Sequence, residues 1–264
     1  MNYQDIIVER QGCWLEITLH RPEKLNSLRE TTAEEILNAL REVEAQRDIA
    51  AVILQGSDKA FCTGIDTSEF TIGDNEYFDF YRKRKRSRKI SQLFRELPSY
   101  TKPIISAIEG FALGGGLELA LMGDMIVAGA NARFGLPEVK LGLMPGGGGT
   151  QTLPRLVGPA LAKELIWTGR RITAAEAREY RLVNHITEAG KALERARDLA
   201  RAIGGNAPLS VMFTKAVIDR GMDLSLAEGM AAEGDASFML CFAKDRQEGL
   251  AAFREKRAPN FQGE

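Results

Sequence analysis

Short apolar runs and helix-like segments alternate through the first half of the chain. Residues 5–10 and 14–19 have the apolar pattern of strands, and residues 50–56, 103–108 and 124–129 are short runs typical of buried strands. Glycine-rich turns lead from some of these runs into segments with helical spacing. Strands that alternate with helices in this way predict an α/β fold.

Helical spacing begins behind recognisable capping sequences. Thr32 and Glu35 fit a capping box, and the apolar positions that follow fall on one helix face (Ile36, Leu37, Leu40 and Val43). Residues 173–176 fit a second capping box. The second half of the chain is mostly helical, with one short β run at residues 182–186 and four helical segments between residues 189 and 256. A change of composition at residues 204–208 is the best candidate boundary between an α/β core and a helical tail.

The composition is that of an ordinary folded protein. The 264 residues carry 35 Lys and Arg against 36 Asp and Glu, so the net charge of −1 gives no general attraction to nucleic acid or anionic membranes. Hydrophobic residues make up 44% and charged residues 27%, which excludes a disordered or collagen-like chain. The three cysteines (Cys13, Cys62 and Cys241) are odd in number and form no C-x-x-C motif, which favours a reducing, cytoplasmic location.

Neither a targeting segment nor a membrane span is expected. The first twelve residues lack the basic and then apolar pattern of a signal peptide. The longest apolar stretch, residues 104–132, contains Glu109, Glu118 and Asp124, whose carboxylates would be costly to bury in lipid. We therefore expect a soluble protein.

Several common catalytic motifs are absent from the sequence. It contains no Walker A loop, no G-x-G-x-x-G and no G-x-S-x-G. The two histidines, His20 and His185, lack the spacing of metal ligands and are interpreted as structural. Cys62 has no basic neighbour in sequence and is interpreted as a small buried hydrophobe rather than a nucleophile.

Two glycine-rich segments each hold one carboxylate among apolar residues. Glu118 follows the triple glycine at residues 114–116, and Glu138 follows Pro137. If the triple glycine is a strand-to-helix turn, its free peptide N–H groups favour negative charge nearby, and Glu118 lies in the first helical turn. Each carboxylate alone fits an ordinary helix-start or loop residue. Together they suggest an acid–base pair, although their spacing does not show that they meet.

A loop after the strand at residues 50–56 offers a third component. Residues 59–70 have the form of a turn whose backbone N–H groups could bind a carbonyl oxygen. A second donor from the triple glycine would complete an oxyanion hole, in which the loss of one donor costs about 2.7–4 kcal/mol of transition-state stabilisation.

These segments resemble the crotonase superfamily of enoyl-CoA hydratases and isomerases along nearly the whole chain. HRPEKLNSL resembles N-R-P-x-x-x-N-A-L, with His20 in place of the common Asn, and KAFCTGID resembles K-A-F-x-A-G-A-D, with Ile65 in place of Ala. The triple-glycine segment resembles G-x-A-x-G-G-G-x-E-L-A, and the segment around Glu138 resembles F-G-x-P-E-x-x-L-G-x-x-P-G-x-G-G-T-Q. AFREKRAPNF resembles the C-terminal F-x-E-K-R-x-P-x-F. Several blocks in one order make the resemblance specific.

The resemblance implies a fold and a set of site residues. The fold would be α/β, a spiral of ββα units, with the active site in a core of residues 1–204 and a helical trimerisation region in residues 205–264. Glu118 and Glu138 would hold and activate a water, and the backbone N–H groups of Ile65 and Gly115 would form the oxyanion hole. The positions implied to bind CoA or substrate are Glu23, Lys24, Leu25, Ala60, Thr63, Gly64 and Asp66, with Phe253 and Lys256 reaching a neighbouring subunit's CoA.

The implied activity is the addition of water across the 2,3 double bond of a 2-enoyl-CoA thioester, as in fatty-acid β-oxidation. No metal or cofactor is expected, because coenzyme A is part of the substrate. The implied partners are the acyl-CoA substrate and further copies of the chain, in a homotrimer or a dimer of trimers. An enoyl-CoA isomerase or an acyl-CoA hydrolase stays open, because the same oxyanion hole serves those enzymes; the presence of both glutamates favours hydration.

A basic run at residues 81–89 (YRKRKRSRK) stands outside these motifs. We interpret it as a solvated helix face balanced by Asp74, Glu76 and Asp79. Attraction of the CoA phosphates is the next interpretation. RNA binding comes last, although the superfamily includes an RNA-binding member.

Overall fold

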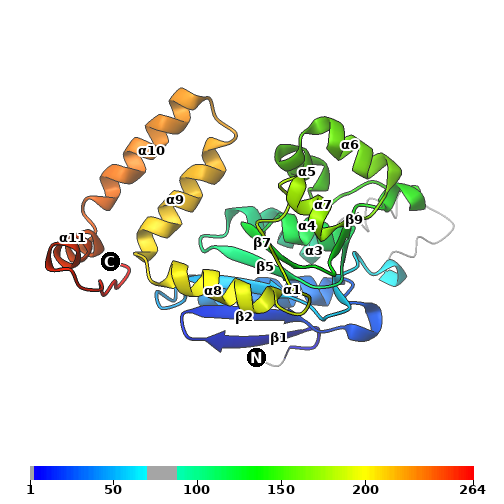
Figure 1. Ribbon diagram of the computed structural model, residues 1–264, viewed down its shortest axis with the longest axis horizontal. Coiled ribbons are helices and arrows are strands. Elements are labelled where there is room, and N and C mark those ends of the chain that lie inside the picture. Colours follow the sequence, from blue (N-terminus) through cyan, green and yellow to red (C-terminus); the bar gives the residue numbers. More distant parts are fainter. Residues whose placement is uncertain (1–2, 70–87) are drawn as a thin grey trace.

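The computed structural model describes residues 3–69 and 88–264. Its larger sheet has six strands, whose parallel part is covered by helices on both faces (Figure 1). In spatial order they are β1 (Ile6–Gln11), β2 (Trp14–Leu19), β3 (Ala51–Gln55), β5 (Ile104–Ile108), β7 (Met125–Gly129) and β10 (His185–Thr187). The β1–β2 pair is antiparallel and the other pairs are parallel. The α/β fold predicted from the sequence is confirmed.

A second sheet of four short strands carries the candidate site. Its order is β4 (Ala60–Cys62), β6 (Phe111–Leu113), β8 (Arg133–Gly135) and β9 (Ile172–Thr173). The first three strands are parallel neighbours. Their carboxyl ends therefore lie side by side, and the loops that leave them meet at one edge of the sheet.

The strands of the larger sheet alternate their side chains between two apolar layers. Val52 and Leu54 of β3 lie in the main core, under helices α1 (Glu30–Glu44) and α3 (Arg88–Glu96). Ala51 and Ile53 lie in a second core beneath helix α8 (Ala192–Gly204). Small residues at every fourth position of α8 (Ala192, Ala196 and Ala200) are buried and let this helix approach the sheet closely.

One capping prediction is confirmed and the other is wrong. Thr173 caps helix α7 (Ala174–Glu179), because its hydroxyl accepts from Glu176 N at 3.2 Å and Glu176 accepts from Thr173 N at 2.8 Å. The first helix begins at Glu30 instead, so Thr32 is its third residue. The Thr32 hydroxyl donates to Asp5, and the Glu35 carboxylate accepts from the backbone N–H groups of Gln4 and Asp5. Both polar side chains bind the N-terminal segment, which local spacing does not reveal.

The second half of the described chain is mostly helical, as predicted. Helices α5 (Gly149–Val157), α6 (Pro159–Thr168) and α7 form one cluster above the smaller sheet. Helices α9 (Pro208–Gly221) and α10 (Leu226–Leu240) form an antiparallel pair that projects from the other end, followed by α11 (Lys244–Glu255) (Figure 1). With α8 these are the four helices expected between residues 189 and 256. The strand expected at residues 182–186 is displaced, since β10 starts at His185.

The division of the chain into a core (residues 1–204) and a helical tail (residues 205–264) stays a prediction. Across residues 3–69 and 88–264, no helix is long and apolar enough to span a bilayer.

Candidate active site

Three loops that leave adjacent parallel strands build the candidate site. The loop after β4 carries Ile65, the turn after β6 carries the triple glycine and Glu118, and the loop after β8 carries Glu138. These residues are far apart in the sequence but share one sheet edge because their strands are neighbours.

The peptide N–H groups of Ile65 and Gly115 form a two-donor site. Gly115 is the first residue of helix α4 (Gly115–Leu121), so its N–H has no acceptor within the helix. Leu28 N donates to Gly64 O at 2.7 Å and Asp66 N donates to Leu28 O at 2.8 Å, so the Ile65 N–H between them faces the other way. A Cβ built on Gly115 would lie 3.5 Å from Ile65 N. Neither N–H has an acceptor among the described residues, which is the geometry that an oxyanion hole requires.

Glu118 lies in the first turn of α4 and is 1% exposed. Its Oε1 accepts hydrogen bonds from the backbone N–H groups of Gly147 and Gly149, each at 2.8 Å. Burial raises the pKa of Glu118, and these N–H groups, with that of Gly146, oppose the rise. The ionised carboxylate is therefore provided with fixed donors, as a general base needs to be.

Glu138 begins the 3₁₀ helix η4 (Glu138–Leu141), and its carboxylate lies over the triple glycine. A Cβ on Gly114 would come within 3.2 Å of Glu138 Oε1, while Oε2 is buried without a partner among the described residues. Burial, together with the charge of Glu118, raises the pKa of Glu138 to about 7. The structure therefore brings the two predicted carboxylates together, and it leaves one of them half-protonated at neutral pH.

The residues predicted to bind CoA lie in the Ile65 loop and in the turn that packs beside it. Glu23 and Lys24 lie in the 3₁₀ helix η1 (Pro22–Lys24), and the Thr63 hydroxyl donates to Leu25 O at 3.2 Å. Gly64 follows with a φ of +111°, which lets the loop turn towards Gly115. Ala60 has no exposed surface with which to line a pocket, and its carbonyl accepts from the side chain of Asn26 at 2.9 Å.

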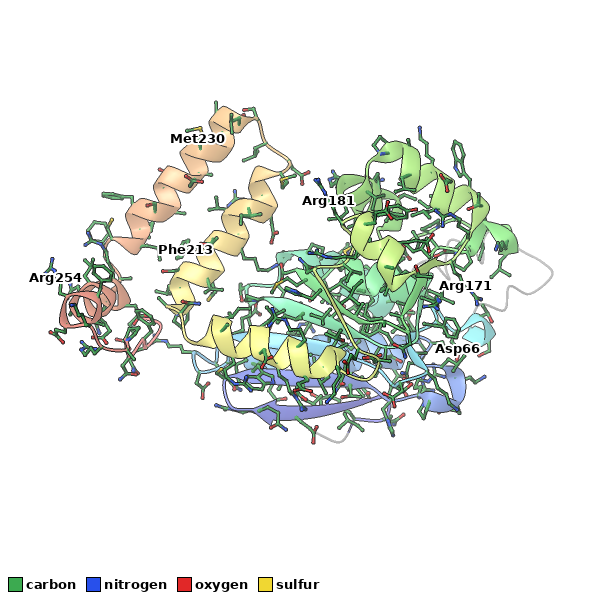
Figure 2. All side chains as sticks on the ribbon, viewed as in Figure 1. Asp66, Arg171, Arg181, Phe213, Met230 and Arg254 are labelled. Atoms are coloured by element: carbon green, nitrogen blue, oxygen red, sulfur yellow. The ribbon has the colours of Figure 1, made fainter. Side chains whose placement is uncertain are left out.

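The predicted C-terminal contacts lie elsewhere in a single chain. Phe253 and Lys256 belong to α11 and its C-cap, and Figure 2 shows the neighbouring Arg254 at the end of the molecule opposite Asp66. These two residues reach the CoA site only from another subunit, which stays a prediction. The basic run is outside the described residues, apart from its last two positions.

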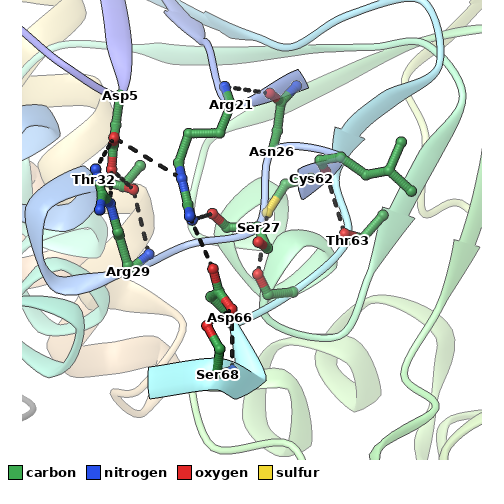
Figure 3. A network of polar contacts seen from close by, with 12 residues as sticks. Asp5, Arg21, Asn26, Ser27, Arg29, Thr32, Cys62, Thr63, Asp66 and Ser68 are labelled. Atoms are coloured by element: carbon green, nitrogen blue, oxygen red, sulfur yellow. Dashed lines mark hydrogen bonds and ion pairs between the residues drawn. The ribbon is translucent and has the colours of Figure 1, made fainter. Parts of the chain in front are cut away.

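A buried network of charged residues holds the Ile65 loop (Figure 3). Arg21 is 8% exposed and donates to Asp66 Oδ2 at 2.9 Å and to Ser27 O at 2.6 Å. Ser68 and Arg21 together lower the pKa of Asp66 to about 2. Asp5, held by Arg29 at 2.6 Å, lies 3.9 Å from Arg21. The Asp66 carboxylate is thus occupied within the protein, next to the residue whose N–H the site requires.

Cys62 is fully buried, as expected of a structural residue. Burial raises the pKa of its thiol to about 12, so it is not a thiolate nucleophile at neutral pH. Within the described ranges, no group of three or more His, Cys, Asp or Glu side chains could hold a metal ion.

The sequence pattern assigned no role to the glycines at 146–149 or to Arg21. A Cβ on Gly147 would come within 2.9 Å of Glu118 Oε2, and one on Gly149 within 3.0 Å of Oε1, so these glycines allow the backbone to approach the carboxylate. A run of four glycines after the second glutamate was the available signal. Arg21 carried no comparable signal, because its partner Asp66 is distant in sequence.

A pair of peptide donors beside two glutamates, at one edge of the smaller sheet, is the arrangement that the resemblance to the crotonase class of acyl-CoA proteins implied. Comparison with known proteins agrees. The sequence model of the enoyl-CoA hydratase/isomerase family matches residues 9–264. The short-chain-enoyl-CoA hydratase of Clostridium acetobutylicum is 40% identical over 259 residues, which is 97% of this chain and 97% of that protein.

The enoyl-CoA hydratase domain-containing protein 2 of Bos taurus is 43% identical over 259 residues, covering 94% of this chain and 84% of that protein. The crystal structure of an enoyl-CoA hydratase from Bacillus anthracis superposes with a TM-score of 0.93 at 39% identity, covering 99% of this chain and 100% of that one. The chain belongs to the enoyl-CoA hydratase/isomerase family of the crotonase superfamily.

Proposed function

We propose that the protein is a 2-enoyl-CoA hydratase, a hydro-lyase in which Glu118 and Glu138 act as the acid–base pair. The observation that carries this proposal is the joint placement of two carboxylates, the buried one of Glu118 and the half-buried one of Glu138, beside two free peptide N–H groups. Its hydratase-named relatives at about 40% identity support the same activity.

In the proposed reaction, the N–H groups of Ile65 and Gly115 bind the thioester oxygen and draw electrons from C3 of the 2-enoyl group. Water attacks C3 while one carboxylate accepts its proton, and the negative charge moves onto the thioester oxygen as an enolate. The other glutamate then delivers a proton to C2. One water is added in all, and a proton exchange between the two carboxylates restores the pair.

The hydrogen bonds divide the two roles. Glu118 accepts two peptide N–H groups, which stabilise its ionised form, so it is suited to accept the proton of water. Glu138 has a buried oxygen without a partner and a pKa raised to about 7, mainly by burial, so it carries a proton to give at neutral pH. Coenzyme A enters as part of the substrate, beside the turn at residues 23–25 and the loop at residues 63–66.

The proposed assembly is a homotrimer or a dimer of trimers, and the proposed location is the cytoplasm. Exposed apolar side chains on the tail support association: Met222, Leu226, Met230, Phe238, Phe242 and Phe253 are each at least 63% exposed. Apolar surface of this kind on one part of a molecule usually marks an interface.

The test is the loss of enoyl-thioester absorbance when the purified protein is mixed with 2-enoyl-CoA esters of short, long, branched and cyclic acyl groups. The proposal predicts turnover with at least one group and a 3-hydroxyacyl-CoA product of matching mass. A flat trace across the whole panel would overturn it. Release of free CoA would instead indicate a hydrolase, and a shifted double bond without added water would indicate an isomerase.

A further inference from the structure

A cavity of about 950 Å³ opens beside the Ile65 loop and the glycines that follow Glu138. It starts at Ile65 and at the glycines 146–148, of which Gly147 donates to Glu118, and it extends between α3, α5 and α9. Near the glutamates its wall is apolar, formed by Ile90, Phe94 and Met122. Because Ile65 belongs to both the oxyanion hole and this cavity, the cavity is the candidate site for the acyl chain of a bound thioester.

The far part of the same cavity is lined by charged side chains. It has four cations and three carboxylates: Arg95, Arg155, Arg181 and Lys215 against Asp124, Asp219 and Asp223. Each carboxylate already faces a cation, since Lys215 binds Asp124 and Asp219, and Arg155 lies 3.2 Å from Asp223. The guanidinium groups of Arg95 and Arg181 form no ion pair within the described residues, and the charged lining as a whole carries one net positive charge.

Arg95 follows Phe94 directly on α3. The Phe94 ring lies against Gly147, since a Cβ there would come within 2.8 Å of its Cζ, and Gly147 donates to Glu118. Ser91, Arg95 and Pro98 line the cavity, as Phe94 does, so Arg95 shares the cavity with the ring that packs on the loop holding Glu118. Glu96 is the carboxylate that interacts with it, through charge alone and from outside the cavity lining.

Arg181 enters the cavity from the opposite side, in the turn after α7. Its φ is +62°, a left-handed conformation that residues other than glycine adopt at a cost. Its backbone N–H donates to Arg178 O at 3.1 Å, while its guanidinium has no ionic partner in the described chain. Figure 2 shows Arg181 on the side of the core that faces α9. Stability alone would favour glycine at position 181, because the left-handed conformation is strained for arginine. Since Arg181 also lines the cavity, its presence points to a binding role.

We propose that Arg95 and Arg181 form a subsite for a carboxylate at the far end of the acyl chain, so that the preferred substrates are monothioesters of 2-enedioic acids with coenzyme A. This inference rests on the proposed hydratase function and names its substrate class. Arginine suits the task because its planar fork binds a carboxylate through two parallel hydrogen bonds and stays charged in a half-apolar cavity. The apolar middle of the cavity would cover the methylene carbons between the double bond and the carboxylate.

The first experiment compares two substrates of equal chain length on the purified protein: a 2-enedioyl-CoA of five or six carbons, and the same thioester with its free carboxylate methylated. We expect kcat/KM for the carboxylate substrate to exceed that for the ester by about tenfold or more. Arg95→Met and Arg181→Gly should each remove about tenfold of that preference while the rate with the ester changes less than twofold. Arg10→Gln, an exposed arginine on β1, is the matched control and should leave the ratio unchanged.

Arg181→Gly separates a binding role from a structural one. Glycine adopts the left-handed conformation freely, so the variant should keep or raise the melting temperature while it loses the carboxylate preference. A structural arginine would lose stability and affect both substrates equally.

The second experiment needs no turnover. The saturated dicarboxylyl-CoA cannot be hydrated, and its Kd, measured by calorimetry against that of the saturated methyl ester, should be about tenfold lower in the wild type and equal in Arg95→Met. Equal Kd values in the wild type would overturn the subsite while the hydratase proposal stands. Preferential binding without hydration of either enoyl substrate would overturn the hydratase proposal while the subsite stands.

Discussion

At the residue scale, the same burial that equips Glu138 as an acid makes its ionised form costly in the folded protein. An unfolded glutamate titrates near pH 4.3, whereas burial raises the pKa of Glu138 to about 7. Between these values the folded state binds more protons than the unfolded state. The contribution of the protonated form to stability is therefore complete below about pH 4.3 and is lost as the pH rises through about 7.

Glu138→Gln should therefore stabilise the protein at alkaline pH. We expect the gain in the free energy of unfolding to be about 1–2 kcal/mol larger at pH 8 than at pH 5, because the carboxyl group of the folded wild type is mostly protonated at pH 5 and mostly ionised at pH 8. Urea unfolding at both pH values measures this, with the exposed Glu9→Gln as the control. If Glu138→Gln were less stable than the wild type at pH 8, the claim that the folded protein raises the pKa of Glu138 would be wrong.

The two glutamates illustrate what the sequence predicts at this scale. Their glycine-rich, apolar surroundings suggested an acid–base pair, and the family resemblance supplied the expectation that they meet; in the structure both carboxylates lie beside the start of α4. The division of labour between them could not be predicted. It depends on which carboxylate receives the N–H groups of Gly147 and Gly149, and that is decided by the path of a loop some thirty residues away in the chain.

At the element scale, the site depends on how closely β4 and α4 approach each other. A Cβ on Gly116 would come within 2.2 Å of Cys62 O, so only glycine lets the helix start beside the strand. Five of the six strands of the larger sheet contain five or six residues, which is long enough for the sequence pattern to predict them, whereas the three-residue β10 was predicted out of place. The strands of the smaller sheet were missed, because two or three residues are too few to display a period.

Arg21 connects η1 to Asp5, just before β1, and to the Ile65 loop. We expect Arg21→Met to lower the free energy of unfolding by about 3 kcal/mol, because it leaves Asp66 charged and buried without its cation. We also expect kcat to fall at least tenfold with a smaller change in KM, because the Ile65 N–H shifts from the thioester oxygen. Arg41→Met, at an exposed pair with Glu96, is the control and should change stability by less than about 0.5 kcal/mol.

Chemical denaturation and steady-state kinetics of the two arginine variants check this prediction. If Arg21→Met loses stability but keeps the wild-type kcat, the network supports folding alone and does not position the Ile65 N–H.

At the scale of the whole molecule, the helical tail exposes apolar side chains that a lone chain would be expected to bury. Leu226 is 81% exposed and Phe253 is 84% exposed. The helical pattern of this region was evident in the sequence. Its projection from the core was not, because the amphipathic pattern of a helix shows that a face is apolar but not which surface covers it.

The helical tail should assemble the chain into trimers or into dimers of trimers. Light scattering coupled to size-exclusion chromatography should give three or six times the chain mass of 29.1 kDa. The double variant Phe238→Asp, Phe242→Asp should shift the protein towards the monomer. Lys191→Asp, an exposed change on the core, is the control. A wild-type protein that remains monomeric at micromolar concentration would contradict the proposed trimer.

The most direct test of the central claim is the kcat for hydration of a short 2-enoyl-CoA by the wild type, Glu118→Gln and Glu138→Gln, with KM measured for each. If the two carboxylates share one water beside the oxyanion hole, each variant should lose at least about a hundredfold in kcat while KM changes by no more than a few-fold. If either variant keeps more than about a tenth of the wild-type rate, the reaction does not require the pair, and Glu118 and Glu138 do not act together on one water.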